Sequence, residues 1–234
     1  MPEHKVNDCF EKIEALWKFV EKKAEVYDEA IKAGKTFRKG NLEDIEKLVT
    51  FLRTWNQARG WKEPKVKEQL KTLWSSKKYA PILREFNEKY SEGELNEAVL
   101  GKFLETLLDL LRGLDGATEI VGTIKLAHVL YPDVFPLLDN PIAKGVGMGS
   151  SVGDINKYLK FKRAVDKTIE RYCPDLPEEE KYKRIDEMLY LWYTWKQDGG
   201  ESLKELLEKF GENCCANLFE NIVDNIQMNI QKGA

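Results

Sequence analysis

Three side chains suited to acid–base or phosphate chemistry lie in one segment, Val121 to Gly147. Lys125 and His128 are three residues apart, so they share one face of the helix expected over residues 124–131. A proline-rich turn follows, and it returns Asp139 towards that face. An amine, an imidazole and a carboxylate that meet can transfer protons or bind a phosphate group. Lys125, His128 and Asp139 are therefore the candidate catalytic residues.

A structural role explains the same residues without catalysis. Asp139 precedes Pro141 by two positions, and a carboxylate placed there can cap the first turn of a helix. His128 bonded to Asp139 would then form a buried polar network at a bent helix junction. The sequence leaves both interpretations open, and with them whether the chain is an enzyme.

The stretch VGTIKLAHVLYPDVFPLLDNPI resembles the core of the helix-hairpin-helix DNA glycosylases. The matching elements are Val121, Gly122, Thr123, Ala127, the Pro-Asp-Val-Phe-Pro run at 132–136, and Asp139. The resemblance implies that backbone amides near Gly122 hold a DNA phosphate and that Asp139 supports attack at the sugar C1′. It further implies Lys125 as the amine of bifunctional members. This chain departs from the family at the first hairpin glycine, where it has Ile120.

The same segment is similar to a second pattern, K-x-x-H-x-x-x-P-x-x-F-P-x-x-D-x-x-I, of uncharacterised all-helical microbial proteins. The matching residues are Lys125, His128, Pro132, Phe135, Pro136, Asp139 and Ile142. Their spacing agrees more closely than that of the glycosylase motif, so this is the preferred resemblance. It implies a helical fold and brings no activity with it.

Basic side chains are concentrated between residues 32 and 78, and they alternate with aromatic ones such as Trp55, Trp61 and Trp74. Cations that meet phosphates beside aromatic faces that stack bases are typical of single-stranded nucleic-acid binding. The candidate nucleic-acid contacts are Lys35, Arg38, Lys39, Arg59, Lys62, Lys65 and, from the hairpin resemblance, Gly122. The alternative is that the tryptophans belong to the core and the lysines to a solvated face.

Apolar residues recur every three or four positions, which predicts an all-α protein of about eight to ten helices. The expected helices are 7–33, 42–60, 62–71, 80–90, 94–112, 124–131, 154–172, 178–196, 202–210 and 214–231. Gly34 is expected to end the first of them. We expect a single helical domain, 1–234, in which residues 1–117 and 118–234 can form two packed lobes.

Charge and cysteine usage narrow the class of protein. The formal net charge of −3 argues mildly against a dedicated nucleic-acid binder. Cys9, Cys173, Cys214 and Cys215 lack C-x-x-C spacing, and with two histidines a zinc site is not expected. The sequence therefore predicts buried, reduced thiols in a soluble, cytoplasmic protein without metal or cofactor. No apolar run reaches the roughly 18 residues of a membrane span, so no membrane partner is expected.

Three functions stay open at this point. The first is association with DNA or RNA through the basic region and the Pro/Gly-rich junction. The second is a non-enzymatic module that binds a protein, or a second copy of itself through the last helix. Its contact surfaces would be the aromatic cluster at 190–195 and the stripe of Leu218, Ile222, Ile226 and Ile230. The third is a degenerate glycosylase-like enzyme.

Overall fold

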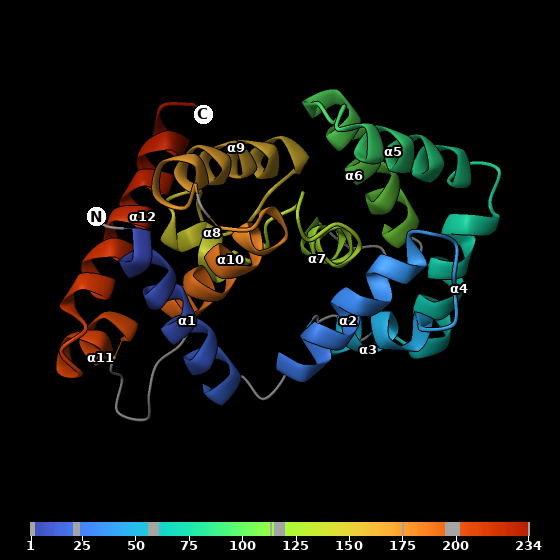
Figure 1. Cartoon of the computed structure of the whole chain (residues 1–234). Coiled ribbons are helices and arrows are strands. Elements are labelled where there is room, and N and C mark those ends of the chain that lie inside the picture. Colours follow the sequence, from blue (N-terminus) through green and yellow to red (C-terminus); the bar gives the residue numbers. More distant parts are fainter. Residues whose placement is uncertain are drawn as a thin grey trace. The chain divides into compact units, whose positions relative to one another are not determined.

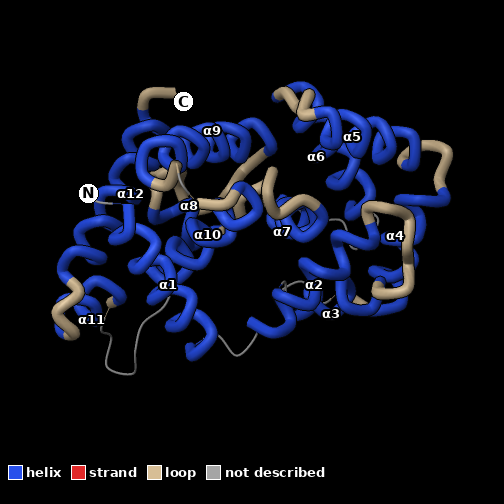
Figure 2. Tube along the Cα trace, in the orientation of Figure 1, coloured by secondary structure: helices blue, strands red, loops and turns tan. Residues whose placement is uncertain are grey.

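The computed structural model describes residues 3–20, 24–55, 61–112, 114, 120–174, 176–194 and 202–233 (Figure 1, Figure 2). These residues form twelve helices and no strand, so the fold is all-α as the periodicity predicts. The number differs from the expected eight to ten, partly because the first expected helix is two helices, α1 (Glu3–Val20) and α2 (Ala24–Phe37). Among the described residues, no helix combines the length and the low polarity that a membrane crossing requires.

The chain forms two compact units. The middle unit is Lys23–Pro132, and the terminal unit combines Met1–Lys22 with Asp133–Ala234. The first helix thus belongs with the C-terminal part of the chain, whereas the sequence suggested lobes of 1–117 and 118–234. Packing explains this division, because α1 lies against helices close to the C-terminus and inside the same unit.

A fully buried helix forms the centre of the middle unit. The helices of this unit are α2, α3 (Ile45–Trp55), α4 (Glu63–Ser75), α5 (Ala80–Glu92), α6 (Glu97–Arg112) and α7 (Ile120–Leu130). α7 packs against α2, α3 and α6, and all of its residues are buried. Its sequence, IVGTIKLAHVL, has apolar residues on every side, so no face of this helix favours water.

α2 and α7 approach so closely that a glycine is required where they touch. A Cβ atom on Gly34 of α2 would lie 1.8 Å from the carbonyl oxygen of Val129 in α7. The sequence suggested that Gly34 ends a helix, but α2 continues to Phe37. Gly34 has no side chain, and this lets the backbones of α2 and α7 touch.

Replacing Gly34 with alanine should destabilise the middle unit by about 3 kcal/mol or more, because a backbone carbonyl cannot yield to the added methyl group. Urea unfolding followed by circular dichroism measures the change in stability. Gly93→Ala is the matched control, since Gly93 has φ +70° but no atom within 4 Å of an added Cβ. The control should be destabilised by only about 1 kcal/mol, the cost of left-handed backbone. Equal destabilisation of the two variants would contradict the close approach.

The terminal unit packs its last helix along the helix that begins at Ile155. Its helices are α1, α8 (Asn140–Gly145), α9 (Ile155–Tyr172), α10 (Glu178–Thr194), α11 (Leu203–Lys209) and α12 (Asn213–Gln231). The stripe of Leu218, Ile222, Ile226 and Ile230 on α12 is buried, and α12 packs mainly against α9. Thr168 of α9 donates a hydrogen bond to the amide oxygen of Asn225 on α12 at 3.0 Å. The stripe suggested as a dimer surface is therefore part of the core of this unit.

Candidate functional site

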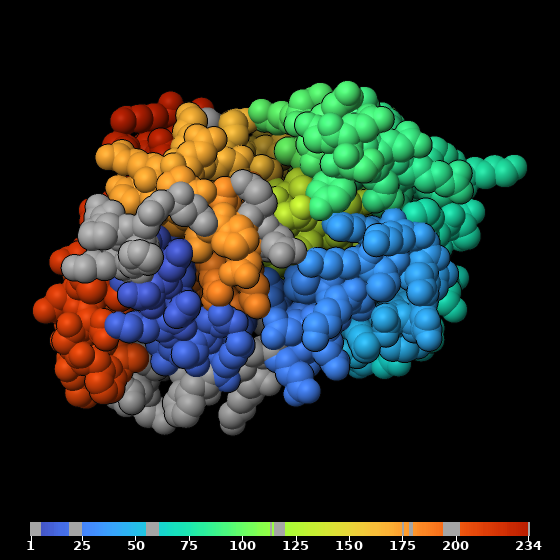
Figure 3. All heavy atoms as spheres, viewed as in Figure 1, coloured from blue at the N-terminus to red at the C-terminus, as the bar shows by residue number. Residues whose placement is uncertain are grey.

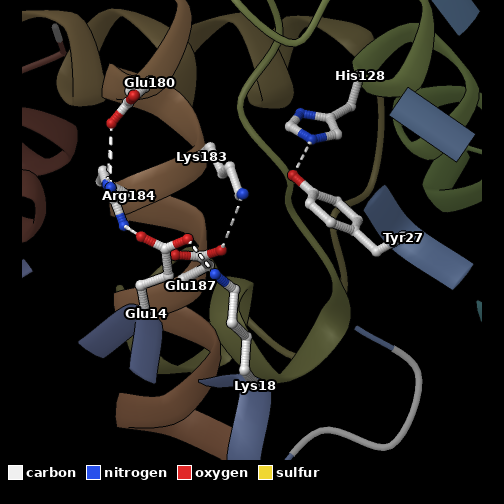
Figure 4. A network of polar contacts seen from close by, with 8 residues as sticks. All are labelled: Glu14, Lys18, Tyr27, His128, Glu180, Lys183, Arg184 and Glu187. Atoms are coloured by element: carbon white, nitrogen blue, oxygen red, sulfur yellow. Dashed lines mark hydrogen bonds and ion pairs between the residues drawn. The ribbon is translucent and has the colours of Figure 1, made fainter. Parts of the chain in front are cut away.

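His128 is buried in α7 and is hydrogen-bonded to Tyr27 of α2. The Tyr27 hydroxyl lies 2.6 Å from Nε2 of His128, and the two rings stack with centroids 5.6 Å apart (Figure 4). Both residues belong to the middle unit. Tyr27 is thus a polar partner of His128 besides Asp139, the partner that the sequence suggested. It supplies the buried imidazole with a polar partner that α7 itself does not offer.

Lys125 and Asp139 occupy different units. Lys125 lies on α7, as predicted, and is only 7% exposed. Asp139 belongs to the terminal unit and caps α8, where its carboxylate accepts a hydrogen bond from the backbone N–H of Ile142 at 3.1 Å. Neither unit by itself contains Lys125, His128 and Asp139 together. The capping role that the sequence suggested for Asp139 is thus present in the structure.

The proline-rich turn before α8 is held by two side chains of the terminal unit. Tyr158 donates its hydroxyl to the carbonyl oxygen of Pro136 at 2.8 Å, and the N–H of Leu137 donates to the carboxylate of Asp186 at 2.9 Å. Asp186 is buried, and this burial raises its pKa well above the ordinary value. Backbone groups of the proline-rich turn therefore bind side chains of α9 and α10.

Tyr27→Phe should lower the free energy of unfolding by about 1–2 kcal/mol, because it removes the hydroxyl that satisfies a buried imidazole nitrogen. Tyr79→Phe is the surface control, since the Tyr79 hydroxyl donates to the exposed carboxylate of Asp109 at 2.8 Å. Urea unfolding of both variants measures the difference. A decrease no larger than that of the control would contradict the role of the Tyr27–His128 bond.

The predicted nucleic-acid contacts separate into exposed lysines and structural residues. Lys35, Lys39, Lys62 and Lys65 are exposed, and the surface of α2 to α4, coloured blue to teal, is visible in Figure 3. Gly122 is buried in the first turn of α7. Arg59 lies outside the described residues.

Arg38 binds the end of α7 rather than extending freely into solvent. Its guanidinium donates to the carbonyl oxygen of Leu130 at 3.2 Å and lies over the rings of Tyr90 and Tyr131, at 4.7 and 5.1 Å from their centroids. The last carbonyl groups of a helix lack partners within the helix, and a cation there also complements the helix dipole. Arg38 therefore caps the central helix, which the sequence did not reveal.

The tryptophans of the basic region belong to the fold. Trp61 is 5% exposed, and Trp74 is half-buried and donates its indole N–H to the carbonyl oxygen of Phe37 at 2.8 Å. The side chain of Trp55 lies outside the described residues. Trp61 and Trp74 thus position α4 against the rest of the middle unit, which is the alternative that the sequence left open.

An ion-pair network joins α1 to α10 in the terminal unit (Figure 4). Glu14 accepts hydrogen bonds from Lys18 at 2.6 Å and from Arg184, which also pairs with Glu180 at 3.1 Å. Partial burial raises the pKa of Glu14, but the two cationic donors outweigh this effect and lower the pKa to about 2. The cross-link between the helices consequently requires an ionised Glu14.

Glu14→Gln should reduce the free energy of unfolding at pH 7 by about 1.5–3 kcal/mol, the range for hydrogen bonds to charged groups. The folded-state pKa of about 2 lies below the ordinary value of 4.5, so this stabilisation is complete above about pH 4.5 and disappears towards pH 2. Chemical denaturation at pH 7 and at about pH 3 should show a narrowing gap between variant and wild type.

Glu220→Gln is the matched control for this pH dependence. Glu220 pairs with Lys204 at 2.7 Å, and both side chains are more than a third exposed. Removing this pair should change the free energy of unfolding by at most about 1 kcal/mol. A gap for Glu14→Gln that stays constant with pH, or one that equals the control, would contradict the network's role.

A cluster of three sulfur atoms in the terminal unit was not foreseen from the sequence. A disulfide bond joins Cys9 of α1 to Cys215 of α12, and the Sγ atom of Cys214 lies 3.9 Å from that of Cys215. The prediction of reduced, buried thiols is therefore wrong for Cys9 and Cys215, and Cys214 is exposed. Both bonded cysteines lie on apolar stripes that meet, as the Phe10–Phe219 ring contact beside them shows.

A cavity of about 560 Å³ adjoins this cluster, and Cys214 lines it. Arg171, Asn217 and Asn221 contribute polar groups to its wall. Cys173 lines it as well, and burial raises the pKa of this thiol to about 12, which keeps it neutral at physiological pH. The cavity and the sulfur cluster lie entirely within the terminal unit.

No protein-family model, curated protein or solved structure matches this chain. The two resemblances found in the segment Val121 to Gly147 consequently stay predictions. The side chains and their surroundings are therefore the only basis for assigning a function.

Proposed function

We propose that the chain is a nucleic-acid-associated helical protein whose middle unit contacts phosphates. The observation that carries this proposal is the charge of residues 32–78, which hold 13 Lys and Arg residues against 5 Asp and Glu residues in a chain of net charge −3. Phosphate neutralisation by Lys and Arg supplies nearly all of the sequence-independent affinity for nucleic acid. The local excess of Lys and Arg in residues 32–78 therefore favours phosphate binding, although the net charge of the whole chain is negative.

Besides Lys32 of α2, four exposed lysines of this region are available to phosphates. Within the described residues, no carboxylate lies at ion-pair distance from Lys39, Lys62, Lys71 or Lys77. Other lysines of the middle unit are already engaged, as Lys47 is with Asp44 at 2.8 Å. We name Lys39, Lys62, Lys71 and Lys77 the basic strip.

Lys62 and Lys77 of the basic strip flank α4, and Lys71 lies within it. At the start of α4, Glu63 pairs with Arg53 at 2.7 Å, and Lys62 precedes it. At the other end, Trp74 lies against both Phe37 and Gly40, so Lys39 is nearby. At 1.5 Å per residue, these ends are about 18 Å apart. This is about five base-pair steps of 3.4 Å, enough for several phosphates of one strand.

The middle unit would bind nucleic acid without catalysing a reaction on it. Lys125 and His128 are buried in α7, so a polymer at the surface of the middle unit does not reach them. An enzyme pocket is not needed for binding of this kind, because phosphate contacts position a protein without reading bases.

Replacing Lys39, Lys62 and Lys71 together with glutamine should weaken binding to a short DNA duplex and to a single-stranded RNA. The slope of log K against log salt should become shallower by about 2 to 3 for the duplex, at about 0.9 for each phosphate that is no longer neutralised. Fluorescence anisotropy between about 50 and 200 mM salt gives both the affinity and the slope.

The control replaces three lysines that already have partners with glutamine: Lys47, Lys89 and Lys102. They pair with Asp44, Glu94 and Glu85, and they carry the same total charge. This variant should retain most of the wild-type salt slope. Absence of binding by the wild type at low salt, or equal weakening in the two triple variants, would refute the proposal.

A further inference from the structure

We propose that the reduced protein binds one soft, thiophilic metal ion through Cys9, Cys214 and Cys215. The ion belongs to the class of Zn²⁺, Cd²⁺ and Cu⁺, for which thiolates are favoured ligands. The site lies in the terminal unit and uses no residue of the basic strip. It goes beyond the proposed function and stands or falls independently of it.

The spacing of the sulfur atoms matches that of metal ligands. A zinc–sulfur bond is about 2.3 Å long, so two thiolates of a tetrahedral site lie about 3.8 Å apart. The Sγ atoms of Cys214 and Cys215 are 3.9 Å apart, and all three Sγ atoms lie within 4.8 Å of one another. Cys9 and Cys215 are closer only because they are bonded. Their Cα atoms are 5.3 Å apart, which leaves room for both sulfurs to reach the ligand spacing after reduction.

The N-terminus of α12 and one ion pair lie beside the three sulfurs. Cys214 and Cys215 lie in the first turn of α12, where unsatisfied N–H groups and the helix dipole stabilise negative charge. Lys12 of α1 pairs with Glu212 at 2.5 Å and also interacts electrostatically with Cys214. The dipole of α12 therefore favours anionic ligands at this site, and the Lys12–Glu212 pair adds no net charge.

The fourth position of a tetrahedral ion would remain open. Cys9 and Cys215 are each 1% exposed, whereas Cys214 is exposed and lines the cavity of about 560 Å³. Water or a small ligand in this cavity can complete the coordination. The carboxylate of Glu212 is a further donor, since its Oε2 lies 3.9 Å from the Sγ of Cys215. Three protein ligands with one open position are the arrangement of a zinc site that can exchange a ligand.

The oxidation state of Cys9 and Cys215 decides whether the ligands exist. A dithiol reductant passes two electrons and two protons to this disulfide, and it leaves as its own disulfide. The metal ion then displaces the remaining thiol protons from the three sulfurs. Because the disulfide withholds two of three ligands, it and the metal ion exclude each other.

Titration of the full chain with Cd²⁺ tests this site. The protein is reduced with a dithiol, which is then removed by gel filtration under argon, and the thiolate-to-cadmium absorption band is followed in the ultraviolet. The reduced chain should reach saturation at one equivalent, and the oxidised chain should bind at least about tenfold more weakly. No band in the reduced chain, or equal affinity in both states, would overturn the proposal.

Cys214→Ala is the decisive variant, because Cys214 is exposed and its removal leaves the Cys9–Cys215 bond and the core intact. Reduced Cys214→Ala should bind Cd²⁺ at least about tenfold more weakly than the reduced wild type. Cys173→Ala is the matched control, since Cys173 lines the same cavity and should not be a ligand. Unchanged affinity in Cys214→Ala, or an equal decrease in Cys173→Ala, would assign the ion to other groups.

Discussion

A helix that is apolar on every side can fold only when other helices cover it completely, and α7 imposes this requirement on the middle unit. Three residues outside α7 each solve one problem that the burial of this helix creates. Gly34 gives α2 the space to reach its backbone, Tyr27 satisfies the imidazole of His128, and Arg38 binds the carbonyl oxygen of Leu130. The three problems are close contact between backbones, burial of a polar side chain, and carbonyl groups at the helix end that lack a partner within the helix.

In the terminal unit, α1 must pack against helices that follow it in the chain only after the 110 residues of the middle unit. The entropic cost of closing such a connection rises only slowly with its length, by about 0.6 kcal/mol for each doubling. An apolar stripe can therefore hold α1 in place when specific links support it. Glu14 with Arg184 supplies an ionic link, and Cys9 with Cys215 supplies a covalent one.

Local features of this fold were predictable, and long-range ones were not. The expected helices 94–112 and 154–172 correspond closely to α6 and α9, because amphipathic periodicity is written into a single segment. Asp139 as a helix cap was predictable for the same reason, since the cap and its partner are three residues apart. Gly34 has the sequence signature of a helix end, and only the position of Val129 shows its real role.

In the candidate site, too, local features were predictable and long-range ones were not. The sequence indicated that Lys125 and His128 share a helix, but it did not reveal Tyr27, a partner of His128 that is 101 positions away. Cys9 and Cys215 are separated by 206 positions, and no spacing rule within one sequence joins residues so distant.

The Cys9–Cys215 bond has a mechanical consequence, because the whole middle unit lies inside the ring that it closes. Tension applied to the chain before Cys9 and after Cys215 passes directly through the two sulfur atoms. Helices α2 to α7 then carry no load while the bond is intact. Once the bond is reduced, only the noncovalent contacts of α1 with α10 and α12 keep this tension from Lys23–Pro132, the unit that bears the basic strip.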